Sequence, residues 1–167
     1  MSKQFYVADL HFGHKNVLAY DNRPFCTVDE MDKELIRNWN SVVTQNDTVY
    51  ILGDISWYNY KETIAIMSQL NGTKILIKGN HDKLNQELKG CFEYICYYKE
   101  IKDNDRDVVL CHYPIPCFNK HFYGAFHLYG HVHNSFESNM IEHFKKAMID
   151  LYDKKCNMFN VGCMMPY

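Results

Sequence analysis

The stretch FYVADLH, residues 5–11, decides the fold that this sequence predicts. Its first four residues are apolar or aromatic, which is typical of a short buried strand. Asp9 and His11 follow at once, two residues apart, so an extended backbone would point both side chains to the same side. The stretch therefore predicts a strand that delivers polar, metal-ligating side chains at its carboxyl end.

The same pattern follows four further apolar runs along the chain. The residues that come directly after these runs are Gly53-Asp54, Gly79-Asn80-His81-Asp82, His112 and Gly130-His131-Val132-His133. Ligands bind at the carboxyl edge of open α/β sheets, because strand ends and loop starts converge there. We therefore expect these side chains to meet in one site.

Strands and helices are expected to alternate along the chain. Apolar runs predict strands at residues 5–8, 48–52, 73–77, 92–98, 107–111, 125–129 and 158–161. Helices are predicted after Thr27, from Asn59 to Asn71-Gly72, and over residues 140–152, the first two from capping patterns followed by apolar residues at helical spacing. The alternation indicates an α/β fold.

The composition describes one ordered globular domain, which we expect to span residues 1–167. Hydrophobic residues make up 47% of the chain and charged residues 23%, which excludes a disordered protein. A net charge of −2 supplies no general field that would attract long nucleic acid.

Cysteine usage and hydropathy predict a cytoplasmic protein. The seven cysteines form no C-x-x-C pair and no small disulfide framework, which favours a reducing compartment. No apolar run approaches the roughly 20 residues of a membrane span, and the amino terminus leaves no room for a signal peptide. We expect no membrane partner.

The residue types at the five strand ends favour divalent metal ions. Asp, Asn and His without Cys suit manganese, iron or zinc, with manganese as the first expectation. Seven ligands are too many for one tetrahedral ion, but they suit two ions that share a carboxylate. His121, His127 and His143 have no such neighbours and are expected to be structural.

These blocks, in this order, resemble those of the calcineurin-like metallophosphoesterases. The resemblance spans residues 5–133 and extends to Asn160-Val161-Gly162, and the stretches 9–14 and 23–25 look like the compact bacterial and phage branch. It implies a four-layer α/β fold in which two mixed β-sheets pack as a sandwich with flanking helices.

The resemblance also implies a division of the ligands between two divalent ions. One ion would be held by Asp9, His11, Asp54 and His133, and the other by Asp54, Asn80, His112 and His131. Asp54 would bridge the two ions. His131 and His133 would then serve different ions, and Val132 between them would point away into packing.

The activity that the resemblance implies is metal-dependent hydrolysis of a phosphoester. A metal-bridging hydroxide would attack phosphorus, and His81 would donate a proton to the leaving oxygen. A small phosphodiester or a nucleotide is the expected substrate, and a diester is favoured over a monoester. Tyrosines that could stack on a nucleobase are Tyr58, Tyr60, Tyr113, Tyr123 and Tyr167.

One departure from the family pattern bears on the substrate. Protein phosphatases of the family continue the Gly-Asp block with an Asp and an Arg, whereas residues 53–58 read GDISWY. The departure argues against phosphoprotein substrates. Phosphate contacts must come from elsewhere, and His14 and Arg23 are the candidates, Arg because its planar fork can bond two phosphate oxygens.

Two other functions stay open at this stage. A catalytically retired member would be a metal-binding scaffold or a protein-interaction module, but such members typically lose ligands and this chain keeps all seven. A nuclease acting on long nucleic acid would need a basic groove or an added capping domain, and the sequence predicts neither.

Overall fold

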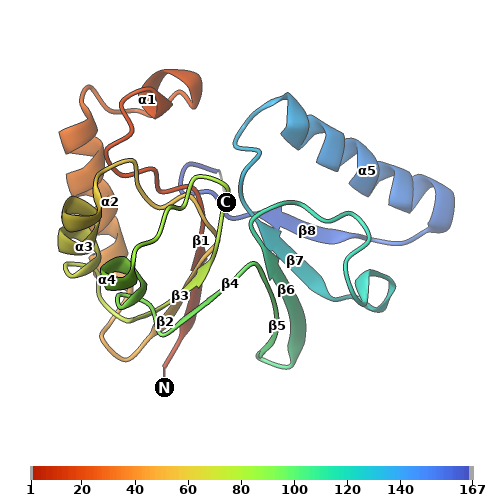
Figure 1. The fold of residues 1–167 in the computed structure, drawn as a ribbon. Helices are drawn as coiled ribbons and strands as arrows, with labels where there is room; N and C mark the ends of the chain where they lie inside the picture. Colours follow the sequence, from red (N-terminus) through yellow and green to blue (C-terminus); the bar gives the residue numbers. More distant parts are fainter. Residues whose placement is uncertain (1, 166–167) are drawn as a thin grey trace.

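Two four-stranded β-sheets lie face to face at the centre of the molecule, with helices on both outer sides (Figure 1). The computed structural model describes residues 2–165. The strands of the first sheet, in spatial order, are β1 (Gln4–Val7), β2 (Thr48–Ile51), β3 (Thr73–Ile77) and β4 (Tyr94–Cys96). Those of the second are β5 (Tyr98–Asp103), β6 (Arg106–Cys111), β7 (Phe126–Tyr129) and β8 (Asn157–Asn160).

The predicted α/β sandwich is confirmed, with one difference in strand direction. All neighbouring strands of the first sheet are parallel. Only the second sheet is mixed, because a tight turn joins β5 and β6 as an antiparallel hairpin while β6, β7 and β8 run parallel. The parallel strands need long crossovers, and these carry most of the helices.

The helices form the two outer layers (Figure 1). The first sheet is covered by α1 (Val17–Tyr20), α2 (Val28–Val42), α3 (Tyr60–Met67) and α4 (Gln86–Lys89), and the second by α5 (Phe136–Tyr152). The predicted caps are present, since Thr27 accepts a hydrogen bond from the Glu30 amide and Asn59 forms a capping box with Glu62. The last helix begins four residues earlier than predicted, because Ser135 caps it.

Alternating side chains of the buried strands fill two different cores. On β2, Val49 and Ile51 face the helices of the first layer, whereas Tyr50 packs between the sheets. Val108 and Leu110 of β6 enter the same inter-sheet core from the other side. Successive side chains of a strand point to opposite faces, so one apolar run supports both layers.

The run at residues 92–98 is not the single strand that its composition predicts. It contains β4, then Tyr97, then the start of β5, so the chain leaves the first sheet and enters the second at this point. The strand β5 continues as far as Asp103 through charged residues, with alternating exposed and half-buried side chains. A search for apolar runs misses such a half-exposed strand.

The arrangement brings five strand ends to one edge of the molecule. β1, β2, β3, β6 and β7 each end directly before one of the predicted metal-ligating blocks. A bridge between Ala8 and Gly162 joins the end of β1 to the segment after β8, and so links the two sheets near this edge. Among residues 2–165, every helix is too short or too polar to cross a bilayer.

Candidate metal centre

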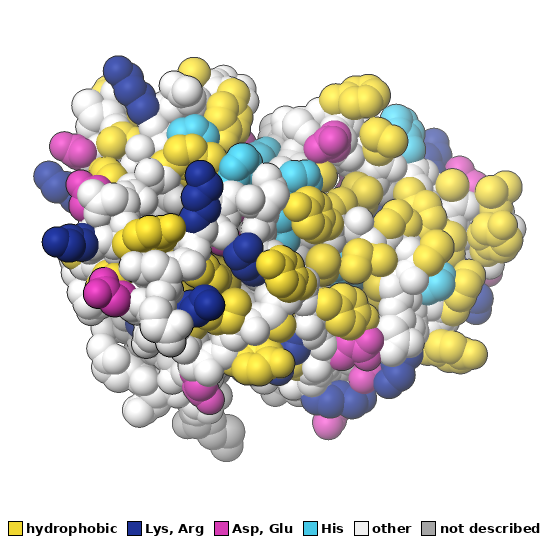
Figure 2. Space-filling model, in the orientation of Figure 1, with side chains coloured by type: hydrophobic (Ala, Val, Ile, Leu, Met, Phe, Trp, Pro, Cys, Tyr) yellow, Lys and Arg dark blue, Asp and Glu magenta, His cyan; other side chains and the backbone are white. Residues whose placement is uncertain are grey.

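We call the first sheet with α1–α4 the first half of the molecule, and the second sheet with α5 the second half. The seven predicted ligands come together where the two halves meet, and several histidine side chains gather there in Figure 2. Ligand atoms of Asp9, His11 and His133 all lie within 4.8 Å of one another. The Nε2 atoms of His11 and His133 are 3.2 Å apart. The end of β1 and the segment after β7 thus supply one cluster of ligand atoms.

Asp54, which follows β2, lies between two histidines. Its Oδ2 is 3.9 Å from His11 Nε2, and its Oδ1 is 3.7 Å from His112 Nε2. Asp54 and His112 also form a second cluster with Asp9, again with ligand atoms within 4.8 Å of one another. The two carboxylate oxygens of Asp54 therefore face two different ligand groups.

Asn80 and His131 complete the second group. Asn80 Oδ1 is 2.9 Å from His112 Nε2 and 3.0 Å from His131 Nδ1. His131 thus faces Asn80, while His133, two residues later, faces His11. Val132 between them is buried in the core beneath α5, as the sequence predicts.

The backbone at these positions differs from the expectation. Five of the seven predicted ligands have a positive φ, between 46° and 71°: Asp9, His11, Asp54, His131 and His133. The prediction that an extended backbone aims the paired side chains is therefore wrong. The left-handed conformation costs a non-glycine residue roughly 1–2 kcal/mol, and such strain clusters at functional sites. Hydrogen bonds from the amides of Asp9 and His11 to the carbonyls of Gly53 and Asp54 hold the first of these turns.

In its neutral form His112 presents a lone pair to the site, as a bound cation requires. His112 donates from Nδ1 to the Leu52 carbonyl at 2.7 Å, so Nε2 of the neutral imidazole carries a lone pair. That lone pair faces Asn80 Oδ1, which is also an acceptor. Burial lowers the pKa of His11 to about 2, which keeps this imidazole neutral as a ligand must be.

The distance between two of the candidate ligand atoms also fits a bound metal ion. A metal ion that binds two imidazole nitrogens at about 2.1 Å in a tetrahedral arrangement holds them about 3.4 Å apart. The 3.2 Å between the Nε2 atoms of His11 and His133 is close to this value. Burial raises the pKa of Asp9 to about 6, a cost that a bound cation would remove. The residues present therefore fit divalent metal ions.

Asp21, which the sequence did not single out, orients His133. His133 Nδ1 donates to Asp21 Oδ2 at 3.2 Å, so its Nε2 is left to face the cluster. Burial lowers the pKa of His133, but the hydrogen bond to Asp21 and the charges of Asp9 and Asp21 outweigh it and leave the pKa raised. A carboxylate behind a ligating histidine is a common device that fixes the ring and strengthens the ligand.

Asp82 is a second carboxylate whose role the sequence did not reveal. It is buried and accepts hydrogen bonds from the amides of Asp54 at 3.0 Å, Ile55 at 2.9 Å and Gly79 at 2.8 Å. It therefore ties the loop after β2 to the loop after β3. Its place in the Gly79–Asp82 block was the only signal that could have identified it.

The structure places Arg23 behind the ligands, and this position does not fit the predicted phosphate contact. Its side chain is buried, and its guanidinium donates to the carbonyls of Leu10 at 2.8 Å and Asp9 at 2.7 Å and to the Asp21 carboxylate at 3.0 Å. These hydrogen bonds occupy the guanidinium nitrogens that would otherwise bind phosphate oxygens. Arg23 instead supports the left-handed turn at Asp9.

His14 and His81 lie at the rim of the site, on either side of Trp57. The ring of His14 stacks on Trp57 with centroids 3.9 Å apart, and the ring of His81 is tilted against it at 4.6 Å. His81 is exposed, and its backbone amide donates to Asp54 Oδ1 at 3.1 Å. Both histidines are thus next to the ligands and open to a bound molecule.

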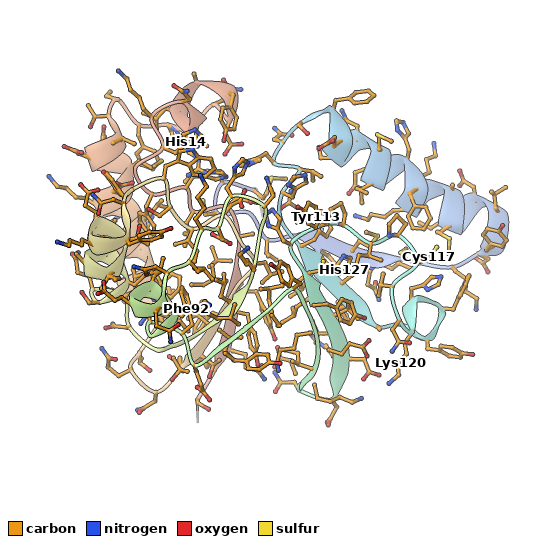
Figure 3. The ribbon with its side chains drawn as sticks, in the orientation of Figure 1. His14, Phe92, Tyr113, Cys117, Lys120 and His127 are labelled. Carbon is orange, nitrogen blue, oxygen red and sulfur yellow. The ribbon has the colours of Figure 1, made fainter. Side chains whose placement is uncertain are left out.

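The second half of the molecule contributes Tyr113 to the opposite rim. Figure 3 shows His14 on the side of the first sheet, and Tyr113 and His127 on the side of the second. Tyr113 is half-exposed, and its ring centroid is 4.6 Å from that of His131. Tyr58 and Tyr60 line a pocket that also includes Trp57, Tyr123 is exposed, and Tyr167 lies outside the described residues.

Comparisons with known proteins agree with this geometry. The sequence profile of the calcineurin-like phosphoesterases matches residues 5–151. An uncharacterized protein of Methanocaldococcus jannaschii is 37% identical over 135 residues, which cover 80% of this chain and 70% of that protein. The Gene 66 protein of Mycobacterium phage L5 is 42% identical over 85 residues, 49% of this chain and 41% of the phage protein.

A solved structure has the same fold. The crystal structure of a protein of unknown function from Aquifex aeolicus superposes with a TM-score of 0.71 and 26% sequence identity, covering 95% of this chain and 89% of that one. The order of the ligand blocks, the two sheets and the profile match lead to one conclusion: the chain belongs to the calcineurin-like phosphoesterase family.

Proposed function

We propose that this protein hydrolyses a phosphoester at a centre of two divalent cations. The observation that carries the proposal is the position of Asp54, whose two oxygens face His11 on one side and His112 on the other. The ligands would divide as the family resemblance implies. Asp9, His11, Asp54 and His133 would hold one cation, and Asp54, Asn80, His112 and His131 the other.

The chemistry is shared between the cations and the side chains around them. When bound, the two cations would supply a hydroxide nucleophile near neutral pH and would neutralise charge on the phosphoryl oxygens. His81, exposed beside Asp54, would donate its proton to the leaving oxygen. Asp82 and Asp21 would hold the ligand loop and the His133 ring in place, so that little reorganisation is needed during the reaction.

A small phosphodiester or a nucleotide is the substrate that these residues favour. A phosphomonoester carries one more negative charge than a diester near neutral pH, and that charge would need a further partner. Arg23, the nearest candidate from the sequence, is already bonded to two carbonyls and to Asp21. His14 remains a candidate phosphate contact at the rim. Manganese suits the mixed oxygen and nitrogen donors.

The test is hydrolysis of bis-p-nitrophenyl phosphate compared with p-nitrophenyl phosphate, using chelator-treated protein with and without added manganese. We expect manganese-dependent cleavage of the diester that is lost in Asp54→Asn. Asp150→Asn, on the exposed surface of α5, is the matched control and should retain full activity.

Other results of this assay favour other functions. Cleavage of the monoester alone would move the substrate search to phosphomonoesters. Two bound metal ions with no turnover of either ester would favour a metal-binding scaffold. Activity that does not depend on metal would overturn the proposal.

A further inference from the structure

A pocket adjoins the metal centre and is formed by two loops of the first half. Its volume is about 310 Å³, and its walls come from the loop after β2 with the first turn of α3, and from the loop after β3 with α4. Trp57 and His81 belong both to its lining and to the rim of the metal centre. A group esterified to a phosphate at the metal centre would therefore reach this pocket directly.

The inner polar groups of the pocket are already satisfied. Thr63 Oγ1 donates to Ser56 Oγ at 3.0 Å, and Ser56 Oγ donates to the Phe12 carbonyl at 3.3 Å. The Asp82 carboxylate accepts three backbone amides. These groups have little left to offer a ligand, so hydrogen bonding to the inner wall does not define the occupant.

Most of the remaining lining is apolar or aromatic, and its polar side chains are those of Asn59, His81 and Lys83. Ile55 and Leu88 are buried and Leu84 is half-buried, while Trp57 and Tyr60 are 39% and 40% exposed. Flat aromatic walls over an aliphatic floor suit a ring system, because rings bury large apolar area and stack at little conformational cost. The volume is at the lower end of the range of about 300–1,000 Å³ for ligand pockets, which suits one ring system.

We infer that this pocket is a specificity site for the aromatic ring of an ester group on the substrate phosphate. The inference rests on the proposed function for the place of the phosphate. It narrows the substrate to phosphoesters of an alcohol that carries an aromatic ring, such as a nucleoside or a phenol. Both kinds of ester group carry a flat ring, which would contact Trp57, Tyr60 and Leu84.

The experiment measures binding without turnover. Phosphonates whose phosphorus–carbon bond cannot be hydrolysed are titrated into manganese-loaded protein, and binding is followed by calorimetry and by tryptophan fluorescence, to which Trp57 contributes. The probes are methylphosphonate, phenylphosphonate and the 5′-methylenephosphonate of adenosine. We expect the two ring-bearing probes to bind about tenfold more tightly than methylphosphonate, the order of a stacking contact.

Variants separate the pocket from the metal centre. Leu84→Asn should reduce the ring preference to near unity and leave methylphosphonate affinity unchanged, because it adds no charge near the phosphonate. Tyr60→Ala, an exposed position, should reduce the preference in part. Leu151→Asn, on the exposed surface of α5, is the matched control and should keep the full preference. Tighter binding of the adenosine probe would identify a nucleobase, and tighter binding of phenylphosphonate an aryl ester.

Equal affinity for all three probes, or a ring preference that persists in both pocket variants, would overturn the inference. The outcome is independent of hydrolysis. Ring preference without phosphoesterase activity would support the pocket and reject the proposed function, whereas activity without ring preference would reject the pocket alone.

Discussion

The Nδ1 atom of His133 lies 3.2 Å from Asp21 Oδ2, and the same carboxylate oxygen accepts a hydrogen bond from Arg23 Nε at 3.0 Å. Arg23 in turn donates to the carbonyl of Asp9 at 2.7 Å. One carboxylate therefore connects a predicted histidine ligand after β7 to the turn that carries predicted ligands after β1. The connection crosses between the two sheets at the metal centre.

The first prediction follows from this contact. Asp21→Asn should weaken manganese binding by about 10- to 100-fold, the usual effect of losing a group that supports a ligand. The amide lacks the negative charge of the carboxylate, which raises the pKa of His133, so His133 should become a weaker ligand. Calorimetric titration of chelator-treated protein measures the change, with Asp150→Asn as the control. Unchanged affinity in the Asp21 variant would show that the contact does not orient His133.

Asp82 should matter for folding even when no metal is bound. Asp82→Ala removes the acceptor of three buried amides, those of Asp54, Ile55 and Gly79. Each buried donor left without a partner costs about 1–3 kcal/mol, so the free energy of unfolding should fall by about 3 kcal/mol or more. Asp82→Asn should cost less, because its oxygen still accepts. Urea denaturation in chelator gives both values, and equal stability of the two variants would contradict the account.

Trp57 should position His81 for proton transfer. Its ring contacts those of His11, His14 and His81, with centroids 4.7, 3.9 and 4.6 Å away. Trp57→Ala should lower kcat about tenfold for esters with poor leaving groups, which need the proton most, and much less for p-nitrophenyl esters. Trp57→Phe should restore part of the loss, and metal content should stay unchanged in both variants. An equal loss for good and poor leaving groups would exclude a role in proton transfer.

Much of the fold could be predicted from the sequence because its strands are buried on both faces. Such strands appear as short apolar runs, and the runs that became β2, β3 and β6 were recognised for this reason. The strand β5 was missed because it is half-exposed and carries alternating charged residues. Long-range pairing, rather than local composition, makes it a strand. The short helices α1 and α4 were missed because four residues give too few turns for a helical period to appear.

The meeting of the candidate ligand side chains could also be predicted, whereas their backbone conformation and the residues that support them could not. Position after a strand predicts which side chains converge, but the positive φ of Asp9 and Asp54 depends on hydrogen bonds to distant loops. Arg23 illustrates the same limit. An arginine near a phosphate site suits phosphate by its chemistry, and only the fold shows that its nitrogens bond the carbonyls behind Asp9 instead.

A pH-dependent prediction concerns His127, a fully buried residue of β7 that is labelled in Figure 3. Its Nδ1 donates to the Val109 carbonyl at 3.1 Å, and its Nε2 accepts from the Ile115 amide at 2.9 Å. Only the neutral ring can make both bonds, and burial lowers the pKa of His127. Above the ordinary histidine pKa of about 6.5 both the folded and the unfolded states are neutral, so the full stability is present.

As the pH falls below about 6.5, His127 binds a proton in the unfolded chain but not in the folded protein. The free energy of unfolding should therefore decrease. His127→Gln should be less stable than the wild type at pH 8, because it loses these bonds and leaves a poorer fit in the core. Its stability should nevertheless decline less between pH 7 and pH 5. Urea denaturation in chelator at a series of pH values tests this, with His143→Gln, an exposed change on α5, as the matched control. Subtracting the free energy of unfolding of each variant from that of the wild type at each pH removes the contribution of the metal-site histidines. Parallel pH profiles for the wild type and His127→Gln would show that His127 accepts a proton in the folded state.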